Sequence, residues 1–537
     1  MDWIKTCSQQ HKSCDRSATP FLPTRILDTS AWPTVKLYES QGKRAQYIAL
    51  SHSWGGHHPI VTTTSTLLEH KKGIHFNTLP KTYQEAILIT RRLGQRYIWI
   101  DSLCIIQDSK SDWEREGAQM ATVYQNAWLT ISATRSSSPT SGCYNSMAKQ
   151  TVEFKGFIRN SPFVLYARRQ MEHVAEDWGP DFGGAAERRK FPLPLLTRGW
   201  AFQERLLSAR VLHFGPQELF WECRELVTCE CKGIGQWEKD ANIVTYQGAP
   251  PKITHNRFVS ASATPGQLHA RWRSMVEEYC RRSLTVGTDR LPGFAGVATE
   301  MQGYLHQRYI AGLWEDSLVT DLMWYRGWSN ATGGRVRKRG GSTWPGIPSW
   351  SWAAVDGQIN YDGDLTQPDP KRRRDPPCTS CCEVLEAKWT LGDPNAYLVL
   401  EAWVLPARLC VSNSPGRGDK VPMLLDEAIR TNHSILDVEP GKRRLFYLVC
   451  INGSPDTSSF FDVDFPLYDE GEWYIEEGEQ VYCAKLSTQG ESKYRDRQWL
   501  VLKCLDAAAQ VYERIGFASN PLACWPCPET KQRIKLV

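Results

Sequence analysis

Polar and reactive side chains interrupt the apolar segment YIWIDSLCIIQD at residues 97–108. Asp101, Cys104 and Gln107 follow Ile, Leu and Trp residues that are typical of a buried strand. A carboxylate at the end of such a strand can act as a general acid or base, or can hold a ribose hydroxyl. It can equally cap a helix or a loop by accepting backbone N–H groups. The sequence leaves both interpretations of Asp101 open.

Cys104 adds a second kind of chemistry, because a thiol becomes a nucleophile when a base and an orienting carboxylate lie beside it. His52, in the segment YIALSHSW, and Asp101 are the residue types that this arrangement needs. Cysteine is also among the residue types most often buried, and an inert packed thiol is the simpler interpretation. We therefore take Cys104, His52 and Asp101 as candidate catalytic residues beside that alternative.

The segment RGWAFQER at residues 198–205 places another carboxylate beside an aromatic ring. On a helix, Trp200, Gln203 and Glu204 would lie on one side. Glu204 could there stabilise the positive charge that develops at a ribosyl carbon when a glycosidic bond is cleaved. A structural ion pair between Glu204 and an Arg is the competing interpretation.

Four residues are candidates for binding a nucleotide. Trp54 or Trp200 could stack on a base, Gly55 would let a ligand approach the backbone closely, and the Gln107 side chain could donate and accept hydrogen bonds. Trp54 and Gly55 also fit a plain tight turn, because they are far less specific than a full phosphate-binding fingerprint.

The elements that must position these residues alternate between strand and helix. Strands are predicted in YIALSHSW, YIWIDSLCI and WLTISAT, and helices in LPKTYQEAILITRRLG and SDWEREGAQMATVYQNA, the second with Ser111 and Glu114 as a capping box. This order predicts a parallel sheet. Ligand and catalytic groups gather at the carboxyl ends of such strands, so His52 and Asp101 are expected to share one cleft.

The remaining chain changes character twice. RVLHF and LFWEC predict a hairpin, residues 269–325 read as mainly helical, and short strand-like segments from about residue 383 predict a β-rich region. We expect the following divisions: 1–46, an N-terminal extension; 47–215, an α/β domain; 216–360, a mainly helical extension; 361–382, a linker; 383–537, a β-rich domain.

Composition excludes several classes of protein. Of 537 residues, 41% are hydrophobic and 23% charged, so packed cores are expected. The net charge of +5 gives no general case for nucleic-acid binding, and the basic segments at 335–339 and 371–374 read as solvated loops. No apolar run is long enough for a membrane helix, and the first residues lack a secretion signal. We expect a cytoplasmic protein, with nuclear targeting through the basic segments as the alternative.

Cysteines are numerous, at 17, and are expected to be free thiols in a reducing compartment. Cys223, Cys229 and Cys231 with His213 contain enough ligands for zinc. Their spacings match no common zinc motif, and neither CTSCC at 378–382 nor CWPC at 524–527 completes a pair of knuckles. We therefore predict no metal site.

Four segments in this order resemble the successive blocks of the fungal heterokaryon-incompatibility (HET) domain: YIALSHSWGG, LPKTYQEAILITRRLGQRYIWIDSLCIIQD, DWEREGAQMATVYQNAWLTISAT and RGWAFQERLLSARVLHFG. Further similarity to segments that commonly follow this domain extends to about residue 360. Family members often carry Tyr where this chain has His52, which adds a titratable group to the expected cleft.

The resemblance implies a fungal intracellular protein that acts with other incompatibility or signalling proteins in non-self recognition and a cell-death response. Through a distant likeness to the TIR domain, it also implies a flavodoxin-like core with NAD or a related nucleotide as substrate; no cofactor is assigned. Three alternatives stay open: an NAD or nucleotide glycohydrolase, a hydrolase or biosynthetic enzyme that uses Cys104 or His52, and a scaffold without chemistry. Whether the chain is an enzyme is undecided at this stage.

Overall fold

The structure is a computed structural model of the chain. It describes residues 1–15, 19–56, 60–144, 152–159, 161–167, 193–232, 251–260, 263–326, 346–361, 379–412, 446–451, 458–460, 462–464, 468–469, 472–476, 478–488, 497–520 and 528–537. The basic segments at 335–339 and 371–374, most of the expected linker, and CWPC at 524–527 lie outside the described residues. None of the described helices combines the length and apolar character that crossing a bilayer requires.

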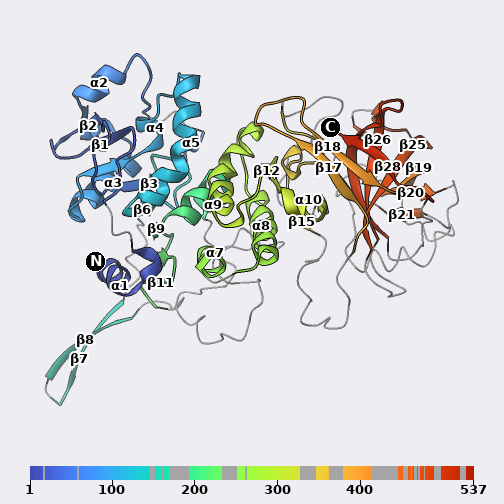
Figure 1. Cartoon of the computed structure of the whole chain (residues 1–537). Helices are drawn as coiled ribbons and strands as arrows, with labels where there is room; N and C mark the ends of the chain where they lie inside the picture. The colour runs from blue at the N-terminus through green and yellow to red at the C-terminus, as the bar shows by residue number, and fades with distance from the viewer. Residues whose placement is uncertain are drawn as a thin grey trace. The chain divides into compact units, whose positions relative to one another are not determined.

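The chain forms two compact units. Unit 1 comprises Met1–Ala263, Arg282–Leu284 and Pro292–Glu300, and unit 2 comprises Thr264–Arg281, Thr285–Leu291 and Met301–Val537. In Figure 1 the elements of unit 1 run from blue to green along the chain.

A nine-stranded mixed sheet is the framework of unit 1, in the order β11-β10-β9-β6-β3-β5-β1-β2-β4. Its strands are β1 (Arg25–Asp28), β2 (Thr34–Glu39), β3 (Ile48–Ser51), β4 (Ile74–His75), β5 (Tyr97–Trp99), β6 (Leu129–Ser132), β9 (Arg210–Phe214), β10 (Leu219–Cys223) and β11 (Val227–Cys229). The four central strands β9-β6-β3-β5 are parallel, which confirms the parallel pairing predicted for the first three strands. The sheet as a whole is mixed, because antiparallel strands extend both edges.

Buried apolar side chains explain why β3 and β5 occupy the middle of this sheet. All four residues of β3 and all three of β5 are buried, as expected for strands covered on both faces. Full burial of a side chain such as Ile48 or Leu50 contributes about 1.5–3 kcal/mol. This packing fixes the positions of the residues that follow each strand.

The helices of unit 1 are α1 (Asp2–Gln10), α2 (Leu67–Lys72), α3 (Lys81–Arg92), α4 (Asp101–Cys104), α5 (Lys110–Asn126), α6 (Gly199–Leu207) and α7 (Pro251–Ser260), with short 3-10 turns that include η1 (Lys12–Cys14). α3 and α5 form where the sequence predicts helices, whereas DSLC, predicted as the end of a strand, forms α4. Figure 1 labels these helices except α6. A separate antiparallel pair is formed by β7 (Val152–Ile158) and β8 (Ser161–Ala167).

The start of α5 differs from the sequence prediction. Ser109, not Ser111, is the N-cap, and its hydroxyl accepts a 3.3 Å hydrogen bond from the Asp112 amide. The capping box predicted from Ser111 and Glu114 is therefore wrong. The helix begins two residues earlier, at Lys110, and Asp112 in its first turn is a buried partner of Arg25, a residue far away in the sequence.

Unit 2 contains helices followed by a large β-structure. The helices are α8 (Pro265–Cys280) and α10 (Leu318–Asp321), and α9 (Ala295–Leu305) contributes residues to both units. Two small hairpins pair β12 (Tyr309–Ile310) with β13 (Leu313–Trp314), and β14 (Trp324–Arg326) with β15 (Ile359–Tyr361). Residues 269–325 are thus helical in part, with short strands that the sequence reading did not separate.

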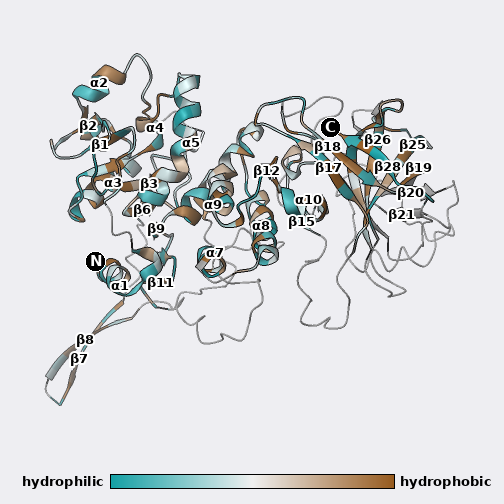
Figure 2. Cartoon of the chain, in the orientation of Figure 1, coloured by the Kyte–Doolittle hydropathy of each residue, from teal (hydrophilic) through white to brown (hydrophobic). Residues whose placement is uncertain are grey.

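An 11-stranded sheet confirms the β-rich C-terminal region. Its strands are β16 (Thr379–Ser380), β17 (Glu383–Lys388), β18 (Tyr397–Ala402), β19 (Val404–Ser412), β20 (Phe446–Ile451), β21 (Ser458–Phe460), β22 (Asp462–Val463), β25 (Gln480–Thr488), β26 (Arg497–Asp506), β27 (Val511–Asn520) and β28 (Gln532–Leu536). A further pair joins β23 (Tyr468–Asp469) to β24 (Glu472–Trp473). In Figure 2 the strands of this sheet carry brown apolar segments beside teal polar ones, as expected for strands with one face in a core.

Candidate functional site

The carboxyl ends of β3 and β5 lie side by side. Ile48 of β3 pairs with Ile98 of β5, and Ala49 pairs with Trp99, in parallel register. The residues that follow each strand must therefore emerge at the same edge of the sheet. His52 follows β3 directly, and Asp101 begins α4 directly after β5.

His52 and Asp101 contact a common set of polar groups. The His52 Nε2 atom lies 2.9 Å from the Tyr83 hydroxyl and 3.7 Å from Asp101 Oδ1. Tyr83 comes from α3, and its hydroxyl lies 2.8 Å from the Ser102 hydroxyl. Burial lowers the pKa of His52, so its imidazole is neutral near pH 7. A neutral imidazole can both donate and accept a proton.

Asp101 is the more accessible member of this pair. Its Oδ2 atom accepts a 2.9 Å hydrogen bond from the indole Nε1 of Trp54, and its Oδ1 atom accepts one of 2.7 Å from the Ser102 amide. The side chain keeps 20% of its surface exposed, whereas that of His52 keeps 1%. Asp101 is the first residue of α4, whose N-cap is Ile100, and its carboxylate accepts one backbone N–H while remaining partly exposed to solvent.

Glu204 joins the site from α6. One of its carboxylate oxygens accepts a hydrogen bond from the hydroxyl of Ser51, the last residue of β3. The Glu204 side chain is buried, and its pKa is raised to about 7, mainly by burial and also by the charge of Asp101. The Ser51 hydrogen bond and the charge of Arg198 act in the opposite direction. A carboxyl group with a pKa near 7 can donate or accept a proton at physiological pH.

Arg198 and Tyr124 surround this carboxyl group. Arg198 Nη1 donates a 2.6 Å hydrogen bond to the His52 carbonyl, and its positive charge acts on both His52 and Glu204. The Tyr124 hydroxyl donates a 3.1 Å hydrogen bond to the Leu50 carbonyl, and burial raises the pKa of this phenol well above its usual value. Both residues hold the end of β3 in place beside Glu204.

Ser53 carries a buried hydroxyl group next to these residues. Only 4% of the residue is exposed, and none of the described residues forms a hydrogen bond with this hydroxyl. Buried polar groups in native proteins are normally paired, so an unpaired hydroxyl calls for a partner from a ligand or water.

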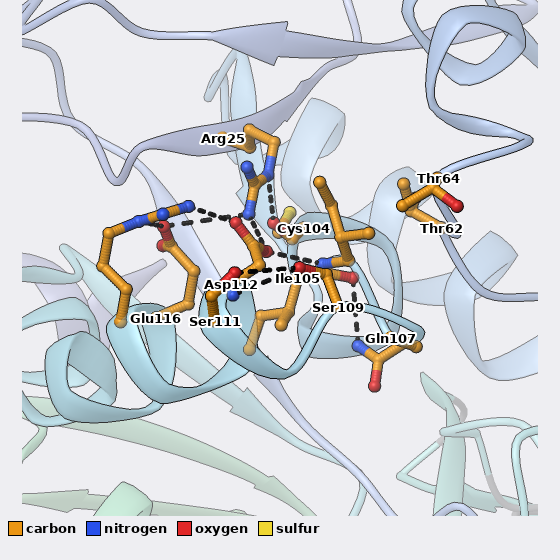
Figure 3. A network of polar contacts seen from close by, with 12 residues as sticks. Arg25, Thr62, Thr64, Cys104, Ile105, Gln107, Ser109, Ser111, Asp112 and Glu116 are labelled. Atoms are coloured by element: carbon orange, nitrogen blue, oxygen red, sulfur yellow. Dashed lines mark hydrogen bonds and ion pairs between the residues drawn. The ribbon is translucent and has the colours of Figure 1, made fainter.

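Cys104 lies at the other end of α4 from Asp101, in the network that Figure 3 shows. The Arg25 Nε atom donates a 2.8 Å hydrogen bond to the Cys104 carbonyl, and the Arg25 guanidinium forms a buried ion pair with Asp112. Asp112 also accepts a 2.8 Å hydrogen bond from the Ile106 amide. This network fixes the loop that carries Asp101 into the site.

The Cys104 thiol itself is packed. Only 1% of the residue is exposed, and burial raises the pKa of the thiol to about 12. Gln107 lies at the base of the same loop, where its side-chain amide donates to the carbonyls of Asp101, at 3.2 Å, and Ile105, at 3.0 Å. These contacts favour structural roles for Cys104 and Gln107.

Gly55 and Trp200, the other candidate binding residues, have structural roles in the surroundings of the site. Gly55 has a positive φ of 64°, and a Cβ atom there would lie 2.4 Å from the Ser137 carbonyl oxygen, so only glycine fits. Trp200 is partly buried against the core of unit 1. The Gln203 side chain accepts a 2.8 Å hydrogen bond from the Gly296 amide and so anchors α6.

The residues considered for zinc are divided among three places. His213 contacts Thr134 and Glu222, at 3.0 and 3.1 Å. Cys229 and Cys231 lie near Glu218, and Cys223 lies near Cys7, His11 and Cys14. These four residues, weighed as possible zinc ligands in the sequence, do not form one group, because antiparallel pairing of β10 and β11 separates Cys223 from Cys229.

Residues 47–204 match the family model described as heterokaryon incompatibility protein (HET). The chain carries a HET domain. No curated protein and no solved structure matches the chain. The HET match begins just before β3 and ends at Glu204, so it spans Ser51, His52, Asp101 and Glu204.

Sequence reasoning missed three residues of the HET-domain site. Tyr83 and Tyr124 fall among apolar residues at helical spacing, although a buried tyrosine hydroxyl normally needs a polar partner and so signals a nearby polar group. Ser51 lies in the predicted strand segment YIALSHSW, and its side chain bonds Glu204. The local sequence contains no signal for that contact, which joins residues 153 positions apart.

Proposed function

We propose that this HET-domain protein acts in heterokaryon incompatibility, where it signals non-self recognition to other cytoplasmic signalling proteins and leads to programmed cell death. The proposal rests on the family match over residues 47–204. We further propose that the residues at the ends of β3 and β5 form its active centre. Glu204, with a pKa raised to about 7 and a hydrogen bond from Ser51, is the observation that carries this second step.

The chemistry that fits this site best is cleavage of a glycosidic bond in NAD or a related nucleotide. Such reactions pass through a positively charged ribosyl carbon, which an ionised carboxylate stabilises. Glu204 can supply that carboxylate, and its protonated form can instead donate a proton to a leaving group. Asp101, which is partly exposed and fixed by Trp54, is placed to accept hydrogen bonds from a ribose.

The strand order supports the proposed likeness to flavodoxin-like and TIR domains. Numbered along the chain, the parallel strands β3, β5, β6 and β9 occupy the spatial order second, first, third, fourth. Flavodoxin-like sheets share this order, and their ligands bind where the first and third strands diverge. Ser51, at the end of β3, lies at that position, beside β6.

Two other candidates have less support. A thiol-dependent hydrolase would need Cys104 as a thiolate, and burial opposes its ionisation. A scaffold without chemistry would leave the raised pKa of Glu204 and the unpaired Ser53 hydroxyl without a role, since such features gather at functional sites.

To test the incompatibility role, the full chain is expressed in a fungal host and the viability of the cells is measured. Wild-type protein is expected to lower viability, and Glu204→Gln, which keeps the shape of the side chain but removes its acid–base chemistry, is expected to abolish the effect. Glu114→Gln is the matched control, because the Glu114 side chain is 59% exposed on α5. An unchanged effect in Glu204→Gln would exclude this site as the active centre.

The substrate is tested with purified protein and NAD, following nicotinamide release. Loss of one essential catalytic carboxylate is expected to reduce the rate by at least about 100-fold in Glu204→Gln. If the wild-type protein kills cells but releases no nicotinamide, the incompatibility role stands and NAD is not the substrate.

A further inference from the structure

Four metal-ligating side chains converge outside the HET match. Cys7 lies on α1, His11 directly follows α1, Cys14 ends η1 and Cys223 ends β10. One ligand atom from each residue lies within 4.8 Å of the others. Cys223 Sγ lies 3.2 Å from His11 Nδ1. Residues more than 200 positions apart in the sequence are thus gathered around one point.

The dimensions of this cluster suit a single zinc ion. Zinc in structural sites is tetrahedral, with bonds of about 2.3 Å to sulfur and about 2.0 Å to nitrogen, so its ligand atoms lie about 3.5–3.8 Å apart. The cluster needs to contract by about 1 Å or less to reach that geometry. Three cysteines and one histidine are also one of the common ligand sets of structural zinc sites.

Hydrogen-bond donors reach two sulfur atoms of the cluster. The Leu226 amide donates a 3.3 Å hydrogen bond to Cys223 Sγ. Arg210 Nε donates one of 3.3 Å to Cys7 Sγ, and another nitrogen of its guanidinium donates to the Cys14 carbonyl at 2.9 Å. Hydrogen bonds of this kind orient metal ligands and tune their charge.

The buried charge of Arg210 also favours a metal bound by thiolates. Arg210 is 7% exposed, and its hydrogen bonds end on Cys7 Sγ and on the carbonyls of Cys14 and Trp128, none of which is charged while the thiol is protonated. A buried cation without an anionic partner is costly. Three thiolates and one Zn²⁺ carry a net charge of −1, which the guanidinium would neutralise.

We propose that Cys7, His11, Cys14 and Cys223 bind one zinc ion in a closed structural site. The ion fastens α1 and η1 to the end of β10, on the strands that extend the sheet beyond the HET match. Two backbone contacts already join these segments: the Ser13 amide donates to Glu225, at 2.6 Å, and Arg224 donates to the Ser13 carbonyl, at 3.3 Å. The prediction of no metal site, made from sequence spacing, is thereby replaced.

A second cluster provides the control. Glu218, Cys229 and Cys231 also bring three ligand atoms together, and Cys231 Sγ lies 3.3 Å from both Cys229 Sγ and Glu218 Oε1. Among the described residues this cluster supplies three ligands, one fewer than a closed structural zinc site has. Cys231→Ser therefore changes a clustered cysteine without touching the proposed ligands.

The test measures metal content of the full-length protein, purified under reducing conditions from zinc-supplemented cells and dialysed against a chelator. Wild type and Cys231→Ser are expected to retain about one zinc per chain, and Cys14→Ser and Cys223→Ser at least about tenfold less. Cobalt exchanged into the wild-type protein is expected to give the intense visible absorption of tetrahedral thiolate coordination, a readout that does not depend on whether the variants fold.

Three results would overturn the proposal. The first is wild-type protein without a stoichiometric divalent metal, or with cobalt absorption that lacks thiolate character. The second is zinc that is lost from Cys231→Ser and kept by Cys223→Ser, which would assign it to the second cluster. The third is a disulfide among Cys7, Cys14 and Cys223, detected by mass spectrometry of the protein purified under reducing conditions. It would show that the cysteines form a redox pair and not a zinc site.

Discussion

Replacing Glu204 with Gln should stabilise the protein above neutral pH. Burial raises the pKa of Glu204 from 4.5 to about 7, so the native state prefers the protonated carboxyl group. Each pH unit of this difference corresponds to about 1.4 kcal/mol, which gives about 3 kcal/mol in total. Between pH 4.5 and pH 7 the unfolded chain releases this proton first, so wild-type stability falls as pH rises through that window.

Glutamine is neutral at every pH and can still accept the hydrogen bond from Ser51. Glu204→Gln should therefore match the wild type in stability near pH 4.5 and exceed it by about 3 kcal/mol near pH 8. Because the two units need not unfold together, the readout should be local to unit 1. We suggest equilibration in urea at each pH, followed by a brief hydrogen–deuterium exchange pulse at one common pH and mass spectrometry of peptides from α6.

The result that would refute this reasoning is a stability difference between Glu204→Gln and wild type that does not change with pH. Such a result would mean that Glu204 titrates alike in the folded and unfolded states. A difference that grows toward acid pH would be a stronger contradiction, because it would mean that the folded state favours the ionised carboxylate. Glu114→Gln, on the exposed side of α5, should show neither trend.

Three further predictions concern the framework of the site. Gly55→Ala should destabilise unit 1 by more than about 2 kcal/mol, because a Cβ would meet the Ser137 carbonyl oxygen at 2.4 Å. Gly56→Ala, with a similar φ but no described atom within 4 Å of its Cβ, should cost about 1 kcal/mol. Equal losses of stability for the two variants in urea unfolding would contradict this reasoning. Arg25→Met should cost up to about 3–5 kcal/mol, because it removes the buried cation beside Asp112 and leaves that carboxylate with the largely exposed Arg115 alone. Arg25→Met with Asp112→Leu should recover part of that loss, and a double variant no more stable than the single one would count against this reasoning. Cys104 should resist iodoacetamide in the native protein, and Cys104→Ser should keep full effect on cells; rapid alkylation of Cys104 would argue for a reactive thiol.

The sequence was sufficient where local patterns determine the structure. The apolar segments around Ile48 and Ile98 predict buried parallel strands, and that pairing alone brings His52 and Asp101 to one edge of the sheet. The sequence also marked Glu204 as a candidate, on the strength of its position beside Trp200. Each of these inferences uses periodicity or strand direction, which are properties of short segments.

Contacts between distant segments could not be predicted in the same way. Arg25 lies in the expected N-terminal extension, yet its side chain binds Asp112 in the first turn of α5 and the Cys104 carbonyl at the end of α4. Cys7 and Cys223 meet only because β10 joins the sheet through β9. Neither meeting leaves a trace in residue spacing, so both required the three-dimensional structure.

The central claim is that Glu204, a buried residue of α6 that contacts the end of β3, titrates near neutral pH. Infrared spectroscopy tests this claim most directly. The difference spectrum between wild-type protein and Glu204→Gln should contain a protonated carboxyl band at pH 6 that disappears with a midpoint at about pH 7. A midpoint near 4.5, or no such band at pH 6, would contradict the claim and leave the proposed active centre without its acid.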